Sequence, residues 1–218
     1  MKKAISFSGQ CRFIKEGYET LKRNLHNFED YDIFIHAWDG ALAKDCEIYK
    51  PKKIIIEPQK NIIPKAVREY SQAHFVHFSM FYTMKESLKL KCIYEKENNF
   101  KYDLVIRTRF DISLDMYLSP EHYNLNTGVY SPDVCANPAV ISDWFNFSNS
   151  PTIDLYQNIY DNIIPYSKQG VMITSGEELI THMLKTQNIP INKILCPLYL
   201  LRDRNVHTQL SSYWKYAN

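Results

Sequence analysis

The chain has 218 residues, a formal net charge of +2 and 45% hydrophobic residues. This length predicts one domain, or one domain with a small annex, that buries a substantial core. A net charge so close to zero excludes the strong basic field of nucleic-acid-binding proteins, and no nucleic-acid partner is expected.

The cysteines and the first residues indicate the compartment. The five cysteines are scattered and form no CxxC motif, so neither a zinc site nor a disulfide framework is expected. Buried free thiols in a reducing compartment explain them best. The apolar run after Lys2 and Lys3 is too short for a signal peptide, and no apolar run reaches the roughly 18 residues of a membrane span. We therefore expect a cytoplasmic protein without a transmembrane segment.

Strands and helices are predicted to alternate in the first half of the chain. Three nearly continuous apolar runs, at residues 4–8, 32–38 and 53–58, are typical of parallel strands that are covered on both faces. The spacing of apolar side chains predicts a helix over residues 13–27, between the first two strands. A long amphipathic helix is predicted over residues 79–97.

The second half mixes short strands, loops and helices. The last dozen residues are polar and aromatic, which is typical of a loosely attached tail. The whole succession predicts an α/β fold with a doubly wound, mainly parallel sheet. The elements expected after the strand that begins at Leu104 are strands at 128–132, 140–147 and 194–200 and helices at 150–162 and 175–186.

The segment from Tyr102 to Ile112 carries the strongest functional signal. It begins as a buried strand and then places Arg107, Arg109 and Asp111 two residues apart, so these side chains share one face of an extended strand. Two guanidinium groups about 7 Å apart repel by about 2 kcal/mol at an effective dielectric of 20, and one carboxylate balances only one of them. The spare positive charge predicts a phosphate-bearing ligand, and Asp111 offers oxygens to a divalent metal ion beside it.

Two strand ends offer further binding residues. Gly9 lies where the first strand meets a helix and permits close approach to the backbone, while Arg12 can reach a phosphate. The alternative is a tight turn with a solvated arginine. Asp39 ends the second strand at the same edge and can bind a base or a ribose hydroxyl, or it can simply serve a turn beside the packed Trp38. Neither GxGxxG nor a Walker motif is present, which disfavours a dinucleotide enzyme or a P-loop ATPase.

The sequence Ser175-Gly176-Glu177-Glu178 begins a helix. Serine at the N-cap and glutamate three residues later form a capping box, in which Glu178 reaches back to the Ser175 amide and contributes about 1 kcal/mol. Either glutamate can instead serve as a general base for a hydroxyl nucleophile; the cap accounts for Glu178, and the role of Glu177 stays open. His207 is a surface or packed residue unless Asp111 lies near it, in which case the two complete a metal–diphosphate site.

Together these segments resemble the small nucleotide-sugar-dependent glycosyltransferases of the GT-A fold, of the type found in bacterial polysaccharide gene clusters and in some large DNA viruses. The similarity spans most of the chain, and the order and spacing of the segments are more specific than any one of them. The matching segments are Ser8-Gly9-Gln10-x-Arg12, Asp32-Ile33-Phe34-Ile35-His36-x-Trp38-Asp39, Ser79-Met80-Phe81-Tyr82, Tyr102-Asp103-Leu104-Val105-Ile106-Arg107-x-Arg109-Phe110-Asp111, Asp143-Trp144-Phe145 and Glu177.

The resemblance implies a single GT-A-like, Rossmann-like domain over residues 1–218, with a mainly parallel central sheet flanked by helices. Residues 1–115 would bind a nucleoside diphosphate sugar, residues 116–207 would bind the acceptor and carry catalysis, and residues 208–218 would form a tail. The donor-binding residues that it implies are Phe7, Ser8, Gly9, Arg12, Asp39, Ser79, Arg107 and Arg109.

The resemblance also implies a metal site. The family holds ribose and a divalent metal ion with an Asp-x-Asp segment, which here reads Arg109-Phe110-Asp111, with Arg109 in the place of the first aspartate. Asp111 and His207 are the expected ligands of Mn²⁺ or Mg²⁺. Arg107 and Arg109 would neutralise much of the diphosphate directly.

The implied activity is a hexosyltransferase-type glycosyl transfer from a nucleoside diphosphate sugar to a hydroxyl of a glycan or glycoconjugate. Glu177 or Glu178 would be the catalytic base and Asp143 would bind donor or acceptor hydroxyls. A membrane-linked acceptor would be met peripherally. Two rivals remain: a sugar nucleotidyltransferase, whose Gly-rich basic loop after the first strand is absent here, and a non-catalytic nucleotide-sugar-binding partner subunit.

Overall fold

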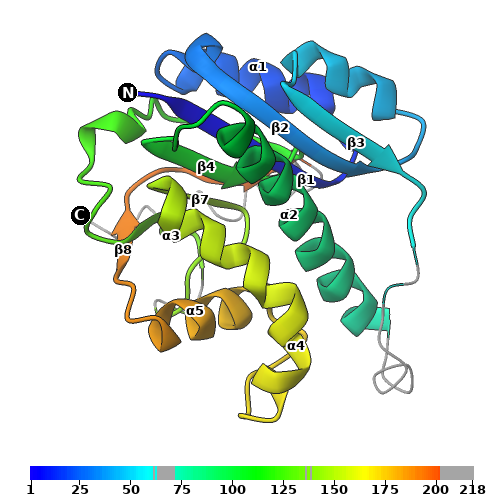
Figure 1. The fold of residues 1–218 in the computed structure, drawn as a ribbon, viewed down its shortest axis with the longest axis vertical. Coiled ribbons are helices and arrows are strands. Elements are labelled where there is room, and N and C mark those ends of the chain that lie inside the picture. Colours follow the sequence, from blue (N-terminus) through cyan, green and yellow to red (C-terminus); the bar gives the residue numbers. More distant parts are fainter. Residues whose placement is uncertain (61, 63–71, 136, 138, 202–218) are drawn as a thin grey trace, which may run out of the picture.

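A seven-stranded sheet with the order β3-β2-β1-β4-β7-β6-β8 forms the centre of the molecule (Figure 1). The computed structural model describes all residues except 61, 63–71, 136, 138 and 202–218. The strands of this sheet are β1 (Lys3–Gln10), β2 (Tyr31–Trp38), β3 (Lys53–Glu57), β4 (Leu104–Thr108), β6 (Val129–Pro132), β7 (Phe145–Ser148) and β8 (Ile191–Ile194).

The strands β3, β2, β1 and β4 are mutually parallel, as the sequence predicts. The strand β7 then runs antiparallel to both β4 and β6, and β8 lies parallel to β6. The chain is therefore an α/β protein with a mostly parallel sheet flanked by helices, compatible with a Rossmann-like fold. Strands from both halves of the sequence share this one sheet.

Each face of the sheet buries an apolar layer. On one face lie α1 (Ile14–Asn24), the 3₁₀ segment η2 (Ala43–Tyr49) and a small sheet of β5 (Ile112–Leu114) and β9 (Leu198–Leu200). Gly17 lets α1 approach this layer closely, because a Cβ atom at this position would lie 2.1 Å from the carbonyl oxygen of Phe110. The described residues also form the 3₁₀ segments η1 (Phe28–Asp30), η4 (Pro120–His122) and η5 (Leu155–Asn158).

The opposite face carries the long helix α2, which crosses the sheet diagonally in Figure 1. Its side chains Phe78, Phe81, Met84 and Leu88 recur every three or four residues and are buried against the sheet. The other helices of this layer are shorter and pack beside α2. The helices of this face are α2 (Gln72–Glu97), α3 (Ser150–Asp154), α4 (Ile159–Ser167) and α5 (Gly176–Thr186).

Several element boundaries differ from those predicted. Helix α2 begins seven residues earlier than residue 79, since Phe78 continues its buried stripe. The strand predicted over residues 140–147 is confined to β7, because residues 142–144 turn before it. The strand predicted over residues 194–200 is two strands in different sheets, interrupted where Pro197 has no amide hydrogen to donate. The helix predicted over 150–162 is divided into α3, η5 and α4.

The strand β3 is an edge strand that is not covered on both faces, contrary to the prediction. Its side chains Ile54, Ile55 and Ile56 are each more than a third exposed. The strands β1 and β2, by contrast, are buried along most of their length, as their apolar runs predict. A continuous apolar run therefore identified a parallel strand in each case but did not distinguish the centre of the sheet from its edge.

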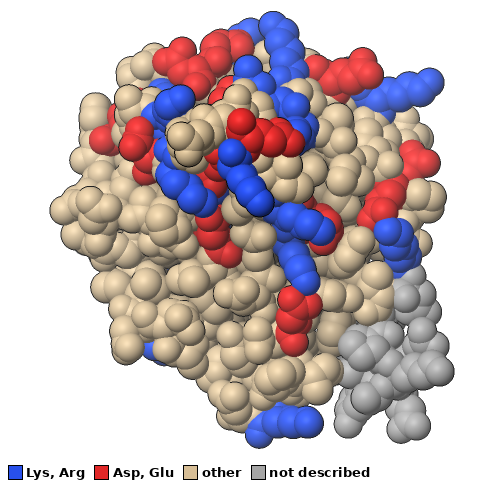
Figure 2. Space-filling model, in the orientation of Figure 1, with Lys and Arg blue, Asp and Glu red and all other residues tan. Residues whose placement is uncertain are grey.

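Charges of both signs are interspersed on the face drawn in Figure 2, mainly over its upper part. The lower part of this face, over α3, α4 and α5, is largely uncharged. In the part of the chain that the structure describes, no helix combines the length and the apolar character needed to cross a membrane.

Candidate active site

The carboxyl ends of β1, β2 and β4 meet at one edge of the sheet, because these strands are parallel and adjacent. The strand β7 is antiparallel to β4 and pairs Phe145 with Thr108, so Asp143 and Trp144, which precede β7, reach the same edge. The first turn of α5 packs here too: a Cβ atom on Gly176 would lie 2.7 Å from Oδ2 of Asp143. The second half of the chain thus places Asp143 and the first turn of α5 at the edge where β1, β2 and β4 end.

A pocket of about 290 Å³ opens at this edge, between the segment that follows β6 and the start of α5. It contains both glutamates that the sequence singles out, together with apolar and aromatic groups. Such a mixture of apolar walls and a few convergent polar groups is typical of small-molecule sites. The lining residues are Val134, Cys135, Asn137, Val140, Ser142, Trp144, Ser175, Glu177 and Glu178.

Glu177 is the carboxylate with the properties of a base. Burial raises its pKa, and the nearby charge of Asp143 raises it further. The hydroxyl of Ser175 donates a hydrogen bond to Oε2 of Glu177 at 3.3 Å, and His77 of α2 lies close enough to act in the opposite direction on its pKa. A carboxyl group with a raised pKa, beside a second carboxylate in a pocket, is suited to proton transfer.

Glu178 has a structural role at the beginning of α5. Its backbone amide donates to the hydroxyl of Ser175 at 3.1 Å, which confirms Ser175 as the N-cap. Its carboxylate accepts from the amide of Met172 at 3.3 Å, so the predicted return contact to the amide of Ser175 is wrong. Only half of the expected capping box forms, because Ser175 already donates its amide hydrogen to the carbonyl of Met172.

Asp143 is held in place by β4. The guanidinium of Arg107 donates to the carbonyl oxygen of Asp143, and the hydroxyl of Thr108 donates to the carbonyl oxygen of Trp144 at 3.1 Å. The side chain of Asp143 is buried, and its Oδ1 atom accepts no hydrogen bond from the described residues. Asp143 thus has a fixed backbone and a buried acceptor oxygen that no described residue uses.

Arg107 is a core residue, contrary to the prediction that it binds the donor. Its side chain is 1% exposed. Burial lowers the pKa of Arg107 to about 10, against the opposing effect of Asp143 and Tyr156. The positive charge that seemed spare in the sequence is therefore used inside the protein, where it holds the turn that carries Asp143.

The predicted contact of Phe7 with a donor base is also wrong. Phe7 is fully buried and stacks on Phe110, with the ring centroids 5.3 Å apart. Ser79 is buried as well, and its hydroxyl accepts from the indole of Trp38 at 2.8 Å and from the side-chain amide of Gln59 at 3.2 Å. Phe7 and Ser79 pack inside the protein next to this edge, and their buried side chains are not positioned to touch a ligand.

The remaining donor residues do lie at the edge. Ser8 and Gly9 pair with the last residues of β2. Ser8 is buried like Ser79, whereas Gly9 has a φ angle of +113° and no described atom within 4 Å of the position of an added Cβ atom. Arg12 and Asp39 are exposed, and Asp39 accepts from the amide of Gly40 at 2.8 Å in a turn. This leaves an exposed guanidinium, an open backbone and a carboxylate beside one another at the ends of β1 and β2.

Arg109 and Asp111 bind each other. The guanidinium of Arg109 donates to both carboxylate oxygens of Asp111, at 2.5 and 3.0 Å. The two residues lie in a bend after β4 ends at Thr108, so the prediction that they share one face of an extended strand is wrong. A divalent ion at Asp111 would have to displace this guanidinium or use the remaining lone pairs. His207, the second expected ligand, lies outside the described residues. The described donor set therefore does not fit a metal ion while Arg109 keeps this position, and the metal site stays a prediction.

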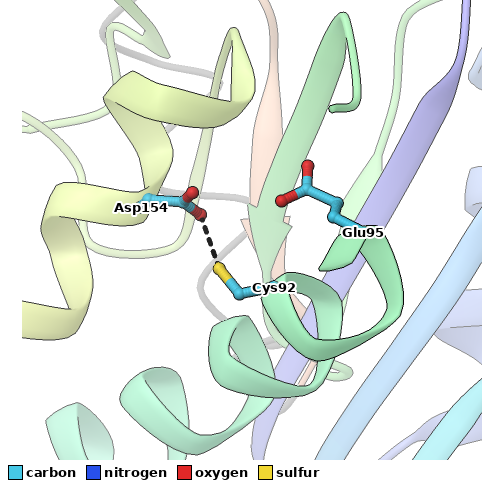
Figure 3. Close-up of side chains that lie close together, drawn as sticks. All are labelled: Cys92, Glu95 and Asp154. Atoms are coloured by element: carbon cyan, nitrogen blue, oxygen red, sulfur yellow. Dashed lines mark hydrogen bonds between the residues drawn. The ribbon is translucent and has the colours of Figure 1, made fainter. Parts of the chain in front are cut away.

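The cluster Cys92, Glu95 and Asp154 brings three potential metal ligands together (Figure 3). The ammonium group of Lys91 fills the position of a cation, since it lies 2.9 Å from Glu95 and 2.8 Å from Asp154. Lys101 contacts the same two carboxylates at 2.8 and 3.4 Å. Two lysines thus balance two carboxylates, and the cluster is an ion-pair network that joins α2 to α3.

Two pocket neighbours were not singled out in the sequence. His77 precedes the predicted start of α2, so the underestimated length of that helix concealed it. Cys135 follows β6, and the charges of Glu177 and Asp143 both reach its thiol. No local signal in the sequence marks Cys135, since β6 reaches this edge only through its antiparallel pairing with β7.

No family model matches the chain, and none of the curated proteins compared with it is similar. The assignment of function therefore depends on the geometry of this edge and on the sequence resemblance.

Proposed function

We propose that this protein is a glycosyltransferase that moves a sugar from a nucleoside diphosphate sugar to a hydroxyl group of a glycan or glycoconjugate. The observation that carries the proposal is the position of Glu177. This carboxyl group, with its raised pKa, lies beside Asp143 in a pocket at the edge where the parallel strands end. The Gly9 loop and Arg109 come from strand ends at the same edge.

In this proposal the donor binds across the ends of β1, β2 and β4. Asp39 accepts hydrogen bonds from the base or the ribose, and the open backbone at Gly9 admits the nucleotide closely. Arg12 and Arg109 bind the diphosphate. Arg109 is part of an ion pair with Asp111, so donor binding draws this guanidinium toward the phosphates or shares it between them and the carboxylate.

The transfer step forms a bond from the acceptor oxygen to the anomeric carbon and breaks the bond from that carbon to the diphosphate. Glu177 takes the proton of the acceptor hydroxyl as the new bond forms. Asp143 accepts a hydrogen bond from a sugar hydroxyl through its unpaired oxygen, which is buried and must first become accessible. The negative charge on the departing nucleoside diphosphate is stabilised by Arg12 and Arg109. Mn²⁺ or Mg²⁺ on Asp111 and His207 stays a prediction from the sequence that the described residues do not support, and no step here depends on it.

A panel of UDP-, GDP- and dTDP-hexoses tests the proposal directly. We expect one class of donor to be hydrolysed slowly to free sugar and nucleoside diphosphate, and faster when an acceptor glycan is present. The assay is run with and without Mn²⁺. Release of pyrophosphate from a nucleoside triphosphate and a sugar phosphate would instead identify a nucleotidyltransferase. A complete absence of stabilisation by UDP, GDP and dTDP in thermal unfolding would contradict nucleotide-sugar binding altogether.

The variant Arg109→Ala is expected to raise the Kd for the nucleoside diphosphate about ten- to a hundredfold, because it removes a charge-assisted contact. It also leaves Asp111 buried without its partner, so the free energy of unfolding should fall by about 1–3 kcal/mol. Titration calorimetry and urea unfolding measure the two effects separately.

The double variant Arg109→Ala/Asp111→Asn separates binding from folding, since it removes the orphaned charge as well. It should recover stability without recovering affinity. Arg23→Ala, on the exposed side of α1, is the charge-matched control and should change neither. Recovery of affinity in the double variant would show that Arg109 only neutralises Asp111 and does not touch the diphosphate.

Gly176→Ala tests the packing of Asp143 against α5. The added methyl group would lie 2.7 Å from Oδ2 of Asp143 and 2.8 Å from Cε of Met80, so Asp143 must move. We expect transfer to slow by about tenfold or more, because small displacements of catalytic groups are costly, and stability to fall by about 1–3 kcal/mol. Gly40→Ala is the control, since no atom of the described residues lies within 4 Å of its added carbon. Unchanged transfer kinetics in Gly176→Ala would remove Asp143 from the mechanism.

A further inference from the structure

Two cysteines that are distant in the sequence lie in contact beside the candidate site. Cys11 follows β1 directly, between Gly9 and Arg12, and Cys46 lies in η2. Their sulfur atoms are 3.7 Å apart although 35 positions separate them in the chain. Contact between the sulfur atoms of two free thiols is the geometry from which a disulfide forms with little movement, since an S–S bond measures about 2.05 Å.

The pair is held in place by its surroundings. The thiol of Cys11 also lies 3.5 Å from the carbonyl oxygen of Trp38, at the end of β2. The hydroxyl of Tyr49 donates to the carbonyl oxygen of Ile14 at 3.3 Å, which ties η2 to the start of α1. Both cysteines belong to the apolar layer on this face of the sheet. The sulfur atoms therefore meet in the folded protein because the edge and η2 are fixed relative to one another.

The two thiols differ in reactivity. Cys11 is 9% exposed and Cys46 is fully buried, so an oxidant from solvent reaches Cys11 first. The hydrogen bond from Cys46 lowers the pKa of the Cys11 thiol, while the same contact and burial raise the pKa of Cys46. Cys11 is thus the more exposed and the more readily ionised of the two thiols, and Cys46 is placed to resolve an oxidised Cys11.

We propose that Cys11 and Cys46 are a modification site that hydrogen peroxide converts to a reversible disulfide. The Cys11 thiolate attacks one peroxide oxygen, the O–O bond breaks and water leaves after protonation, giving a sulfenic acid. The sulfur of Cys46 then attacks the sulfur of Cys11, the S–O bond breaks and a second water leaves with the Cys46 proton. The two thiols together lose two electrons and two protons, and one peroxide becomes two waters.

The bond would join the segment between Gly9 and Arg12 covalently to η2. This segment is the part of the edge where the backbone is open and where Arg12 is exposed. Oxidation would therefore restrict the loop that follows β1. The existence of the cross-link is independent of the function proposed above, and its detection requires no nucleotide.

Peptide mapping of the native, full-length protein tests this inference. The protein is treated with a small excess of hydrogen peroxide, alkylated and digested with trypsin without reduction. We expect peptide 4–12 joined to peptide 45–52, because trypsin cuts poorly between Lys50 and Pro51. Dithiothreitol should restore both free peptides. The same treatment in 8 M urea is the reference for pairing without structure, and it should give a mixture of cysteine pairs.

Two variants complete the test. In Cys92→Ser the 4–12 to 45–52 cross-link should form as in the unaltered protein, because Cys92 lies elsewhere and contacts Asp154. In Cys46→Ser the cross-link cannot form, and dimedone should trap a sulfenic acid on Cys11. The inference is overturned if the native protein gives no such cross-link, or gives the same mixture of pairs as the urea-unfolded chain.

Discussion

Replacing Glu177 by glutamine is expected to slow sugar transfer by about 10²- to 10⁴-fold, the usual contribution of a general base. The same change should raise the stability of the protein at neutral pH. Glu177 is charged there at a cost, since burial and the neighbouring Asp143 both disfavour its ionised form. Glutamine keeps the size of the side chain and can still accept from Ser175, but it carries no charge. A residue that lowers stability and supports activity is the pattern expected of a catalytic group.

The pH dependence of this stability gain identifies its cause. The folded-state pKa of Glu177 is raised above its unfolded value. The loss of folding free energy caused by ionising Glu177 is therefore absent below the unfolded pKa and develops as the pH rises through the folded pKa. Urea unfolding should therefore show equal stabilities for the two proteins near pH 4 and a more stable Glu177→Gln variant at pH 7–8. Glu178→Gln is the control and should retain most of the activity. Full activity in Glu177→Gln would assign the base elsewhere.

Replacing Lys91 by methionine is expected to lower the free energy of unfolding by about 3–5 kcal/mol, which is typical when one partner of a buried ion pair is removed. Lys91 and Glu95 are almost completely buried, and the ammonium group contacts Glu95, Asp154 and the hydroxyl of Ser150. Methionine fills the same volume but leaves the carboxylates with Lys101 as their cationic partner. The melting temperature should fall by about 10 °C in calorimetry.

A matched pair of variants gives this measurement its reference. Lys89→Met lies on the same helix, where its side chain is 57% exposed, and should change the stability by less than about 0.5 kcal/mol. Lys91→Met/Glu95→Gln removes the orphaned charge and should recover part of the loss. Equal stability of Lys91→Met and the unaltered protein would mean that Lys101 alone balances both carboxylates.

The central part of the fold could be predicted because its signals are local. The apolar runs of β1 and β2 and the N-cap Ser175 each identify their element without reference to distant residues. The position of Asp143 could not be derived in this way. It depends on the antiparallel pairing of β7 with β4, a contact between segments about 40 residues apart that periodicity does not encode.

The roles of the arginines show a similar limit. The spacing of Arg107, Arg109 and Asp111 singled out two residues, Arg109 and Asp111, that do pair, although in a bend after β4 and not on one face of a strand. It did not reveal that Arg107 would find the carbonyl oxygen of Asp143, nor that Asp111 would balance Arg109 so completely. A count of charges along a strand indicates that partners exist, but only the tertiary structure shows whether they are ligands or other parts of the chain.

The pairing of β4 also determines the order in which the molecule can be completed during synthesis. Strands β1 to β4 can assemble once residue 108 has left the ribosome, but the second edge of β4 has no partner until β7 emerges. That delay is about 40 residues, or roughly 2–8 s at common rates of translation. During it, an apolar strand with unpaired backbone groups is open to other chains. The segment that closes this edge also carries Asp143, so the nascent chain loses its exposed edge and gains the turn with Asp143 in the same event.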